Sequence, residues 1–277
     1  MEQILLFLLG IFAGAAGSMI GVGGGFIIIP VLIMFYPLLS ATQISTISLV
    51  CVFVNSLAGV IAAAKYKRVD FKSALIFSLA SLPGTVLATF LASKVPIQIF
   101  RIFLGILFLG AATLLFYNTL KNSYDTTNSA SSGSFTRKIT DALGQEYSYS
   151  FNPSLGIFAS ILIGFVSTLF GIGGGIFYVP LFVNVLGMPV RIATATSQFG
   201  LLLSSSVGSF MYVSQGILHG VSLIYVFIAL GIIVGVIAGT KFANRVKPVF
   251  IIRFFSIVVF LTGLRIMISA FGLSFNF

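Results

Sequence analysis

Long apolar runs separated by short polar segments dominate the chain. The longest runs contain about twenty residues and almost no charge, and they cover 73–91, 97–120, 221–240 and 249–270. An α-helix needs about 20 apolar residues to cross the hydrocarbon core of a bilayer. These runs show no strict alternation of polar and apolar positions, which favours helices over a β-barrel. The pattern therefore predicts an all-α polytopic membrane protein.

Composition agrees with this prediction. Of the 277 residues, 58% are apolar and 7% are charged, whereas soluble domains carry roughly 25% charged residues. The net charge is +10, but the Lys and Arg residues lie mainly between or at the ends of apolar runs, where they orient a protein in a membrane. We therefore expect a lipid bilayer as the partner and no nucleic acid. The first residues lack a basic n-region, so the first apolar segment is expected to be retained.

The chain contains an internal repeat. The segment 18–30 aligns without gaps with the segment 168–180, and four glycines and a proline coincide at an offset of 150. This duplication predicts a first membrane repeat at 1–120 and a second at 153–277. Between them, 121–152 is rich in Ser, Thr, Asn and Tyr. Such a composition predicts a solvent-exposed linker, with a short helix around residues 135–143.

Each repeat begins with an apolar segment that ends at a glycine-rich break. A shorter apolar segment follows the break. The pair forms either one broken helix or a hairpin that enters the membrane and returns, and three transmembrane helices follow. With a hairpin, each repeat has an odd number of segments, which makes the two repeats inverted, as is typical of secondary transporters. One face then carries most basic residues, namely Lys65, Lys67, Arg68, Lys72, Lys121, Arg137, Lys138, Arg191, Lys241, Arg245 and Lys247.

The positive-inside tendency favours this second alternative. It predicts a multi-pass protein of the cell (plasma or inner) membrane in which both termini lie outside. The linker 121–152 is then cytoplasmic. Only Lys94 and the helix-end residues Arg101 and Arg265 lie toward the other face.

The two glycine-rich breaks are the strongest candidates for a site. Glycine weakens a helix by roughly 1 kcal/mol relative to alanine, and backbone groups freed inside a membrane must find partners. A helix that resumes after a break presents free N–H groups and the positive end of its dipole, which favours an anion. Close helix packing is the alternative explanation for small residues, and it fits Gly231, Gly235 and Gly239. The expected substrate-binding glycines are Gly21, Gly23, Gly24, Gly25, Gly171, Gly173, Gly174 and Gly175.

The few polar residues within the apolar runs gather in corresponding segments of both repeats. Their hydroxyl and amide groups either replace part of the hydration shell of an oxyanion or join helices by hydrogen bonds. Ser48, Ser197 and Gln198 follow the breaks by one short segment, and we expect them to complete the site. Arg101 and Arg253 lie about one turn inside their helices. We expect these arginines to snorkel to the interface, with attraction of an anion as the alternative.

The paired Gly-x-Gly-Gly-Gly-x-x-x-x-Pro blocks resemble those of the TauE/SafE family of sulfite exporters, also known as the TSUP permeases. The resemblance covers nearly the whole chain, including the Ser- and Thr-rich segments after the blocks. The second repeat keeps the Ala-Thr-Ser signature at 195–197, whereas the first has Ser-Thr-Ile-Ser at 45–48. The resemblance implies a permease for small sulfur-containing anions such as sulfite, thiosulfate or organosulfonates.

The spans contain no arrangement that is typical of catalysis or metal binding. All five acids, Glu2, Asp70, Asp125, Asp141 and Glu146, lie outside them, and no Ser/His, paired-acid or His/Cys cluster lies within them. We therefore expect no enzymatic activity, no catalytic residue, no metal and no cofactor. The alternatives to a transporter are an anion channel built on the same site, or a membrane scaffold or sensor that acts through the linker. The sequence also allows a homodimer.

Overall fold

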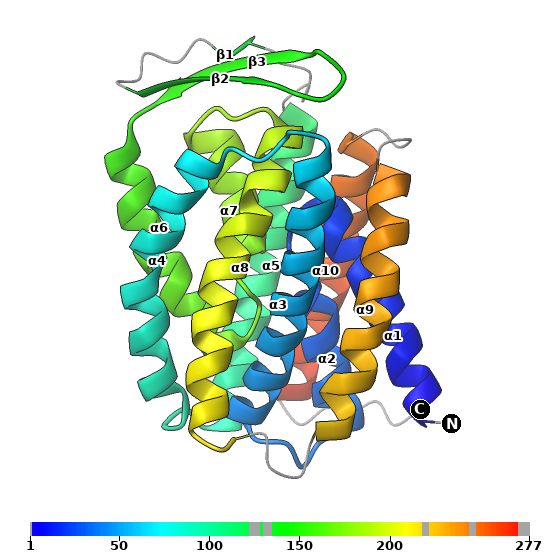
Figure 1. The fold of residues 1–277 in the computed structure, drawn as a ribbon. Helices are drawn as coiled ribbons and strands as arrows, with labels where there is room; N and C mark the ends of the chain where they lie inside the picture. The colour runs from blue at the N-terminus through cyan, green and yellow to red at the C-terminus, as the bar shows by residue number, and fades with distance from the viewer. Residues whose placement is uncertain (1, 122–127, 130–134, 218–221, 244–247, 271–277) are drawn as a thin grey trace.

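The computed structural model describes residues 2–121, 128–129, 135–217, 222–243 and 248–270. Figure 1 shows a bundle of helices with a small β-sheet at one end, called the sheet end below. Six of the described helices are long and apolar enough to cross a membrane. The prediction of an all-α polytopic membrane protein is confirmed for the bundle. The first repeat forms α1 (Glu2–Ile20), α2 (Gly25–Phe35), α3 (Ala41–Lys65), α4 (Phe71–Ala92) and α5 (Ile97–Lys121).

The second repeat follows the same order of helices. It forms α6 (Pro153–Phe170), α7 (Gly175–Pro180), η1 (Leu181–Val185), α8 (Val190–Ser214), α9 (Ser222–Ala243) and α10 (Pro248–Ala270). The element η1 is a wider π-helical turn that continues α7 directly after Pro180. A proline inside a helix removes one backbone hydrogen bond and crowds the preceding turn, so the change of helix type begins where the ring lies.

Helices α1 and α2 form a hairpin. Tyr36, directly after α2, donates a hydrogen bond to the carboxylate of Glu2 at the start of α1, so the second arm returns to the end where the first began. The 19 residues of α1 extend over about 28 Å at 1.5 Å per residue, nearly the thickness of a bilayer core. The predicted in-and-return path is confirmed, and the hairpin nearly crosses before it turns.

Helices α6 and α7 form a second hairpin, which enters from the sheet end. Phe151, just before α6, packs against Phe77 at 5.9 Å between ring centroids. Phe182 in η1 packs against the same ring at 5.5 Å. The returning arm of this hairpin therefore comes back to the sheet end, opposite to the end where α1 begins (Figure 1).

The two repeats interlock through close helix contacts. α1 packs against α9, and α6 packs against α4, so the first arm of each hairpin contacts the other repeat. A Cβ atom added to Gly235 would lie 2.1 Å from the carbonyl oxygen of Ile11, and one added to Gly164 would lie 2.1 Å from that of Ser81. Glycine is thus needed for the approach of the backbones. The packing explanation for Gly231, Gly235 and Gly239 fits these contacts.

Helices α3 and α8 pack against each other in the middle of the bundle, and α5 and α10 form a further pair. α3 and α8 also carry most of the buried hydroxyl and amide side chains. Each hairpin therefore turns beside a central helix that offers polar groups.

The linker differs from the prediction. Instead of a short helix around residues 135–143, it forms a sheet of β1 (Asn128–Ser129), β2 (Phe135–Thr140) and β3 (Glu146–Phe151) in the order β1-β3-β2. β2 and β3 are antiparallel. Side chains along both strands alternate between exposed and more buried positions. This period of two is typical of strands, and aromatic and β-branched residues favour them, whereas the prediction relied on polar composition alone.

Candidate functional site

The two glycine turns meet in the interior of the protein. Residues 21–25, called tip 1, and residues 171–175, called tip 2, are all buried. A Cβ atom added to Gly25 would lie 2.9 Å from the carbonyl oxygen of Gly171, and one added to Gly175 would lie 2.4 Å from Cα of Val22. The tips are therefore in direct contact, and only hydrogen side chains leave room for it.

The tips share one backbone conformation. In each tip, three glycines have φ between 75° and 84°, in the left-handed region. L-residues with side chains rarely adopt this region, whereas glycine does so without penalty. These residues are Gly21, Gly23, Gly24, Gly171, Gly173 and Gly174. The glycines thus serve two needs at once, which are a sharp reversal of the chain and the approach of the second tip.

A helix begins at each tip. Gly24 is the N-cap of α2 and Gly174 the N-cap of α7, and neither helix start has a side-chain cap. Among the described residues, the N–H groups of Gly24, Gly25, Gly174 and Gly175 have no hydrogen-bond acceptor. Free N–H groups at a helix start, together with the helix dipole, attract negative charge. The two uncapped helix starts therefore come one from each repeat.

The predicted serines lie at the tips. The Ser48 hydroxyl on α3 donates to the carbonyl oxygen of Gly171 at 2.6 Å. The Ser197 hydroxyl on α8 donates to the carbonyl oxygen of Gly21 at 2.8 Å. Both serines are fully buried. Each repeat thus supports the tip of the other, and in this state both hydroxyl protons bind protein carbonyls.

Gln198 lies beside α1 rather than at the free N–H groups. Its Nε2 donates to the carbonyl oxygen of Gly17 at 3.1 Å. Asn55, which was not among the predicted site residues, donates from Nδ2 to the carbonyl oxygen of Gly14 at 3.4 Å. Since a carbonyl can only accept, the amide oxygens of Gln198 and Asn55 take no part in these bonds. Both oxygens are buried and lack a partner within the described part of the chain.

Sequence reasoning missed an apolar pair at the tips. The positions where Gly23 and Gly173 would carry Cβ lie 2.9 and 2.4 Å from Cγ1 of Val52, and 3.4 and 3.2 Å from the side chain of Leu201. Val52 on α3 and Leu201 on α8 thus cover both tips. Their spacing of 201 − 52 = 149 equals the Ser48–Ser197 spacing of 197 − 48 = 149. This shared offset marks Val52 and Leu201 as equivalent positions of the two repeats, and it is the sequence signal by which they could have been found.

The arginines near the helix ends differ from each other. Arg253 is exposed, as predicted for a snorkelling side chain. Arg101 is only partly exposed, and its Nε is buried without an acceptor among the described residues. The preceding residue, Phe100, packs at 5.3 Å against Phe170, directly before tip 2. Arg101 therefore places a cation on the helix that flanks this tip.

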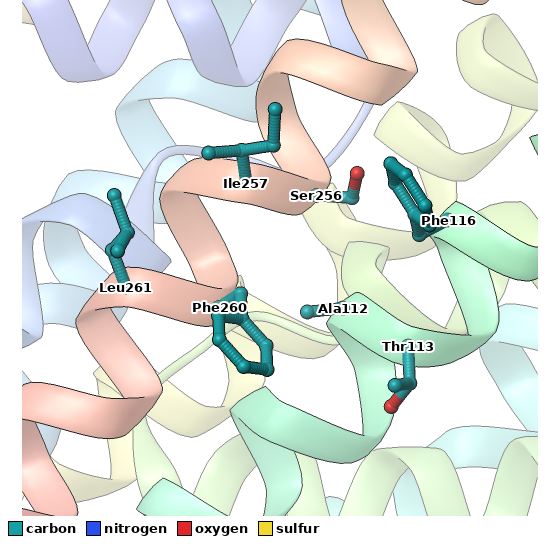
Figure 2. Close-up of a pocket in the computed structure, with 7 residues that line it drawn as sticks. All are labelled: Ala112, Thr113, Phe116, Ser256, Ile257, Phe260 and Leu261. Atoms are coloured by element: carbon teal, nitrogen blue, oxygen red, sulfur yellow. The ribbon is translucent and has the colours of Figure 1, made fainter.

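A separate hollow of about 260 Å³ lies between α5 and α10 (Figure 2). Its lining is apolar except for two hydroxyls, which are already bound, because Ser256 donates to the carbonyl of Arg253 and Thr113 to carbonyls of its own helix. The lining residues are Ala112, Thr113, Phe116, Ser256, Ile257, Phe260 and Leu261. None belongs to a tip, to α3 or to α8. The hollow has no chemistry that would favour an anion.

Two hairpins that enter a helical bundle from opposite ends and meet inside it are typical of membrane transporters. The chain belongs to the sulfite exporter TauE/SafE family, whose model matches residues 6–266. It is 35% identical over 223 residues to the probable membrane transporter protein YunE of Bacillus subtilis, covering 78% of this chain and 80% of the relative. The protein is accordingly a membrane transporter of this family.

Other relatives are more distant. The probable membrane transporter protein MJ0441 of Methanocaldococcus jannaschii is 26% identical over 256 residues, or 88% of this chain and 85% of the relative. Sulfite exporter TauE/SafE family protein 6 of Arabidopsis thaliana is 29% identical over 142 residues, or 50% of this chain and 32% of the relative. No solved structure matches the chain.

Proposed function

We propose that this transporter is a permease for small sulfur-containing anions, such as sulfite, thiosulfate or organosulfonates, which bind between the two tips. One observation carries the proposal, namely the four N–H groups of Gly24, Gly25, Gly174 and Gly175 that lack an acceptor among the described residues. A sulfur oxyanion offers several acceptor oxygens to such donors. The sulfur class is taken from the family, and one relative carries sulfite exporter in its name.

The remaining site residues support the tips or flank them. Gly21, Gly23, Gly171 and Gly173 shape the turns, Ser48 and Ser197 release their hydroxyls to the anion when the tips part, and Gln198 fixes the end of α1. Because the tips are in contact in this state, an anion enters only when one of them moves. Binding is therefore coupled to a change of conformation.

We also infer that the repeats, 1–120 and 153–277, are inverted copies and that they alternate access to the site. The reciprocal contacts of α1 with α9 and of α6 with α4 support this inference. So does the return of the two hairpins to opposite ends. Movement of one hairpin at a time would open the site to one side of the membrane at a time.

For orientation we propose that the linker 121–152 is cytoplasmic and both termini are outside the cell membrane. Most described basic residues lie on the linker sheet or at helix ends on that side, whereas Lys94 lies just after α4, Arg101 in the second turn of α5 and Arg265 near the end of α10, at the other end. Arg245 and Lys247 lie outside the described residues. A basic face of this kind is typical of the cytoplasmic side.

The function is tested with purified protein in proteoliposomes. Saturable uptake of sulfite, thiosulfate or taurine, with counterflow, is expected for a carrier. Gly175→Ala should lower this flux at least tenfold, because its methyl group would meet the backbone of Val22. Gly110→Ala is the matched control, because a Cβ at Gly110 would meet nothing within 4 Å. Flux that rises linearly without counterflow would indicate a channel, and no flux with any of the sulfur anions would reject the proposal.

A further inference from the structure

The linker sheet is fastened to the bundle by two ion pairs, and both involve the connection between α3 and α4. Arg137 on β2 binds the carboxylate of Asp70 with both Nε, at 3.1 Å, and a terminal nitrogen, at 2.6 Å. Arg68 binds Asp141, in the turn between β2 and β3, at 3.4 Å. The backbone N–H of Ala142 adds a hydrogen bond of 2.9 Å to the carbonyl of Tyr66. The sheet is thus attached at one defined place.

Asp70 is the centre of this attachment. The residue is 1% exposed, and besides the bonds from Arg137 its carboxylate accepts hydrogen bonds from Ser73 and from the hydroxyl of Tyr149 on β3, each at 2.6 Å. Burial alone would raise the pKa of the Asp70 carboxyl, but the hydrogen bonds from Arg137, Ser73 and Tyr149 outweigh it and hold the pKa below its ordinary value. The carboxylate is therefore charged at neutral pH. A bidentate, partly buried pair of this kind is among the stronger side-chain contacts.

A short path of contacts joins Asp70 to tip 1. The backbone N–H of Asp70 donates to the hydroxyl oxygen of Thr196 on α8 at 3.1 Å. The next residue, Ser197, donates to the carbonyl of Gly21. The start of α8 therefore lies between the linker sheet and the tip. Movement of α8 away from tip 1 has to break the Ser197–Gly21 bond, and it must also break the Asp70–Thr196 bond or displace Asp70, to which the sheet is bound.

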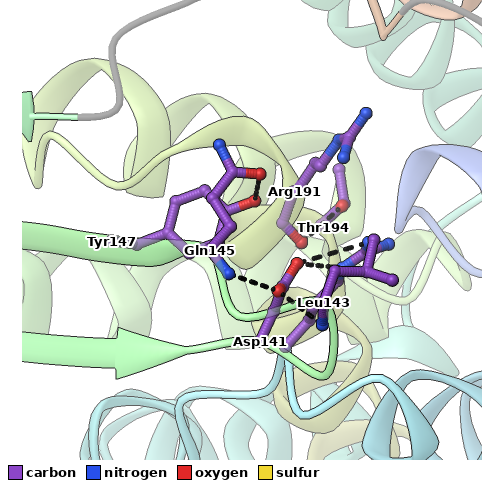
Figure 3. A network of polar contacts seen from close by, with 7 residues as sticks. Asp141, Leu143, Gln145, Tyr147, Arg191 and Thr194 are labelled. Carbon is purple, nitrogen blue, oxygen red and sulfur yellow. Dashed lines mark hydrogen bonds and ion pairs between the residues drawn. The ribbon is translucent and has the colours of Figure 1, made fainter.

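The inner face of the sheet covers the elements that would move. Tyr147, Tyr149 and Phe151 on β3 are buried in one apolar cluster with Phe182 of η1 and Ile192 of α8. Figure 3 shows the turn at Asp141 and Gln145 lying over the start of α8, next to Arg191 and Thr194. The sheet thus lies over both the returning arm of the second hairpin and the beginning of α8.

The opposite end of the bundle is held differently. In the described ranges its polar contacts include the hydrogen bonds of Tyr36 to Glu2, of Thr42 to the carbonyl of Ala92 at 3.3 Å and of Ser45 to the carbonyl of Leu169 at 2.9 Å. None of these is an ion pair or involves a sheet. The two ion pairs of the described residues both lie at the sheet end.

We propose that the β2–β3 hairpin is a latch that closes the transport pathway at the sheet end, and that Asp70 is the positioning residue that connects the latch to α8. The proposal rests on the proposed alternating-access function. With the latch docked, α8 stays on tip 1 and the sheet end is closed. Release of the Arg137–Asp70 pair frees α8, so the population of carriers that are open at the sheet end increases.

The test measures access to each end with single reporter cysteines in a Cys51→Ala background. Thr194→Cys reports the sheet end, because Thr194 lies near the start of α8, and Ser45→Cys reports the opposite end, because Ser45 lies near the start of α3. Their backbones lie beside Gly21 and Gly171 respectively. Arg137→Gln should raise the labelling rate of the first reporter by a charged, membrane-impermeant thiol reagent about tenfold, and lower that of the second. Lys138→Gln is the matched control, because Lys138 neighbours Arg137 on β2 but is exposed. Arg137→Lys should restore at least part of the wild-type rate.

Each outcome decides between the alternatives. Equal rates in Arg137→Gln and Lys138→Gln would overturn the latch, as would a rise at both reporters, which would mean general loosening of the fold. Flux of sulfur anions by the wild type is measured on the same preparations. Wild-type flux with unchanged labelling rejects the latch alone, whereas the expected labelling without flux of any sulfur anion rejects the substrate proposal and leaves the latch standing.

Discussion

The hydroxyl of Ser48 donates a hydrogen bond of 2.6 Å to the carbonyl oxygen of Gly171. Ser197 makes the reciprocal bond to Gly21 at 2.8 Å. In both cases the donor lies in one repeat and the acceptor in the other. The two tips are consequently fixed by an exchange between the repeats, and neither repeat can form its tip in this arrangement alone.

Replacement of either serine by alanine should weaken this exchange. Loss of the hydroxyl leaves a buried carbonyl without its donor, which costs about 1–3 kcal/mol. We expect Ser48→Ala and Ser197→Ala each to lower the midpoint of thermal unfolding and to reduce anion flux by similar factors. Ser206→Ala is the control, because Ser206 is half-buried on α8 and its hydroxyl donates within its own helix, to the carbonyl of Leu203. Unfolding curves and flux that match the control would contradict the proposed role.

The glycine contact between α1 and α9 should be sensitive to any side chain. Gly235→Val would force a Cβ to within 2.1 Å of the Ile11 carbonyl oxygen, so the helices have to separate. Overpacking of this kind costs about 1–3 kcal/mol. We expect a lower unfolding midpoint in detergent, with Gly110→Val, on an open surface, close to wild type. An unchanged midpoint in Gly235→Val would show that α1 and α9 are further apart than described.

The sequence predicted the bundle well because its signals are local. Apolar length marks each helix, and basic residues between the runs selected the hairpin over a broken helix. The glycine blocks were placed at one site because they recur at a fixed offset, and Ser48 and Ser197 because each follows a block by one short segment. Contact between tip 1 and tip 2 could not be predicted, because it depends on how two distant segments cross. The hydrogen-bond partners of the two serine hydroxyls depend on that crossing, so the sequence could not predict them either.

Docking of the linker sheet should respond to acid and not to mild base. The pKa of Asp70 and that of Asp141 are held below their ordinary values. Burial opposes the lowering of both pKa values. It is outweighed at Asp70 by hydrogen bonds from Arg137, Ser73 and Tyr149, and at Asp141 by backbone N–H groups and Arg68. A lowered pKa in the folded state adds stability above the ordinary pKa of about 3.9, and that stability is lost as the pH falls through the lowered value.

We therefore expect amide hydrogen exchange in β2 and β3, corrected for its intrinsic pH dependence, to stay slow from about pH 8 to pH 5 and to accelerate below about pH 4. In Asp70→Asn the exchange should be faster at neutral pH and should depend less on acid. A loss of protection near pH 6 would mean that another group controls docking.

The position of the termini is a direct test of the orientation. A reporter enzyme that is active only outside the cytoplasm should be active when it is fused to the C-terminus, and inactive when it is inserted in the linker after residue 130. We expect this pattern because basic residues concentrate at the sheet end, and such a face is typically cytoplasmic. The opposite pattern would reverse the proposed sides of the membrane.

The linker shows where composition misleads. Its many Ser, Thr and Asn residues are typical of an unstructured loop. However, Tyr147, Tyr149 and Phe151 occupy alternate positions along β3, and all three are buried. Asp70 was noted only as an acid outside the spans. Its partners Arg137 and Tyr149 lie 67 and 79 positions away in the chain, so a single sequence offers no sign of the pairing. Long-range side-chain contacts of this kind appear only once the fold is known.

The side chains that contact the two tips, among them Val52, Leu201, Ser48 and Ser197, carry no charge. A monovalent anion held there would therefore bring one uncompensated negative charge with it through the membrane. Each such charge gains or loses about 2.3 kcal/mol per 100 mV of membrane potential. Turnover would then produce an electric current, and an inside-negative voltage would by itself drive the ligand out of the cell.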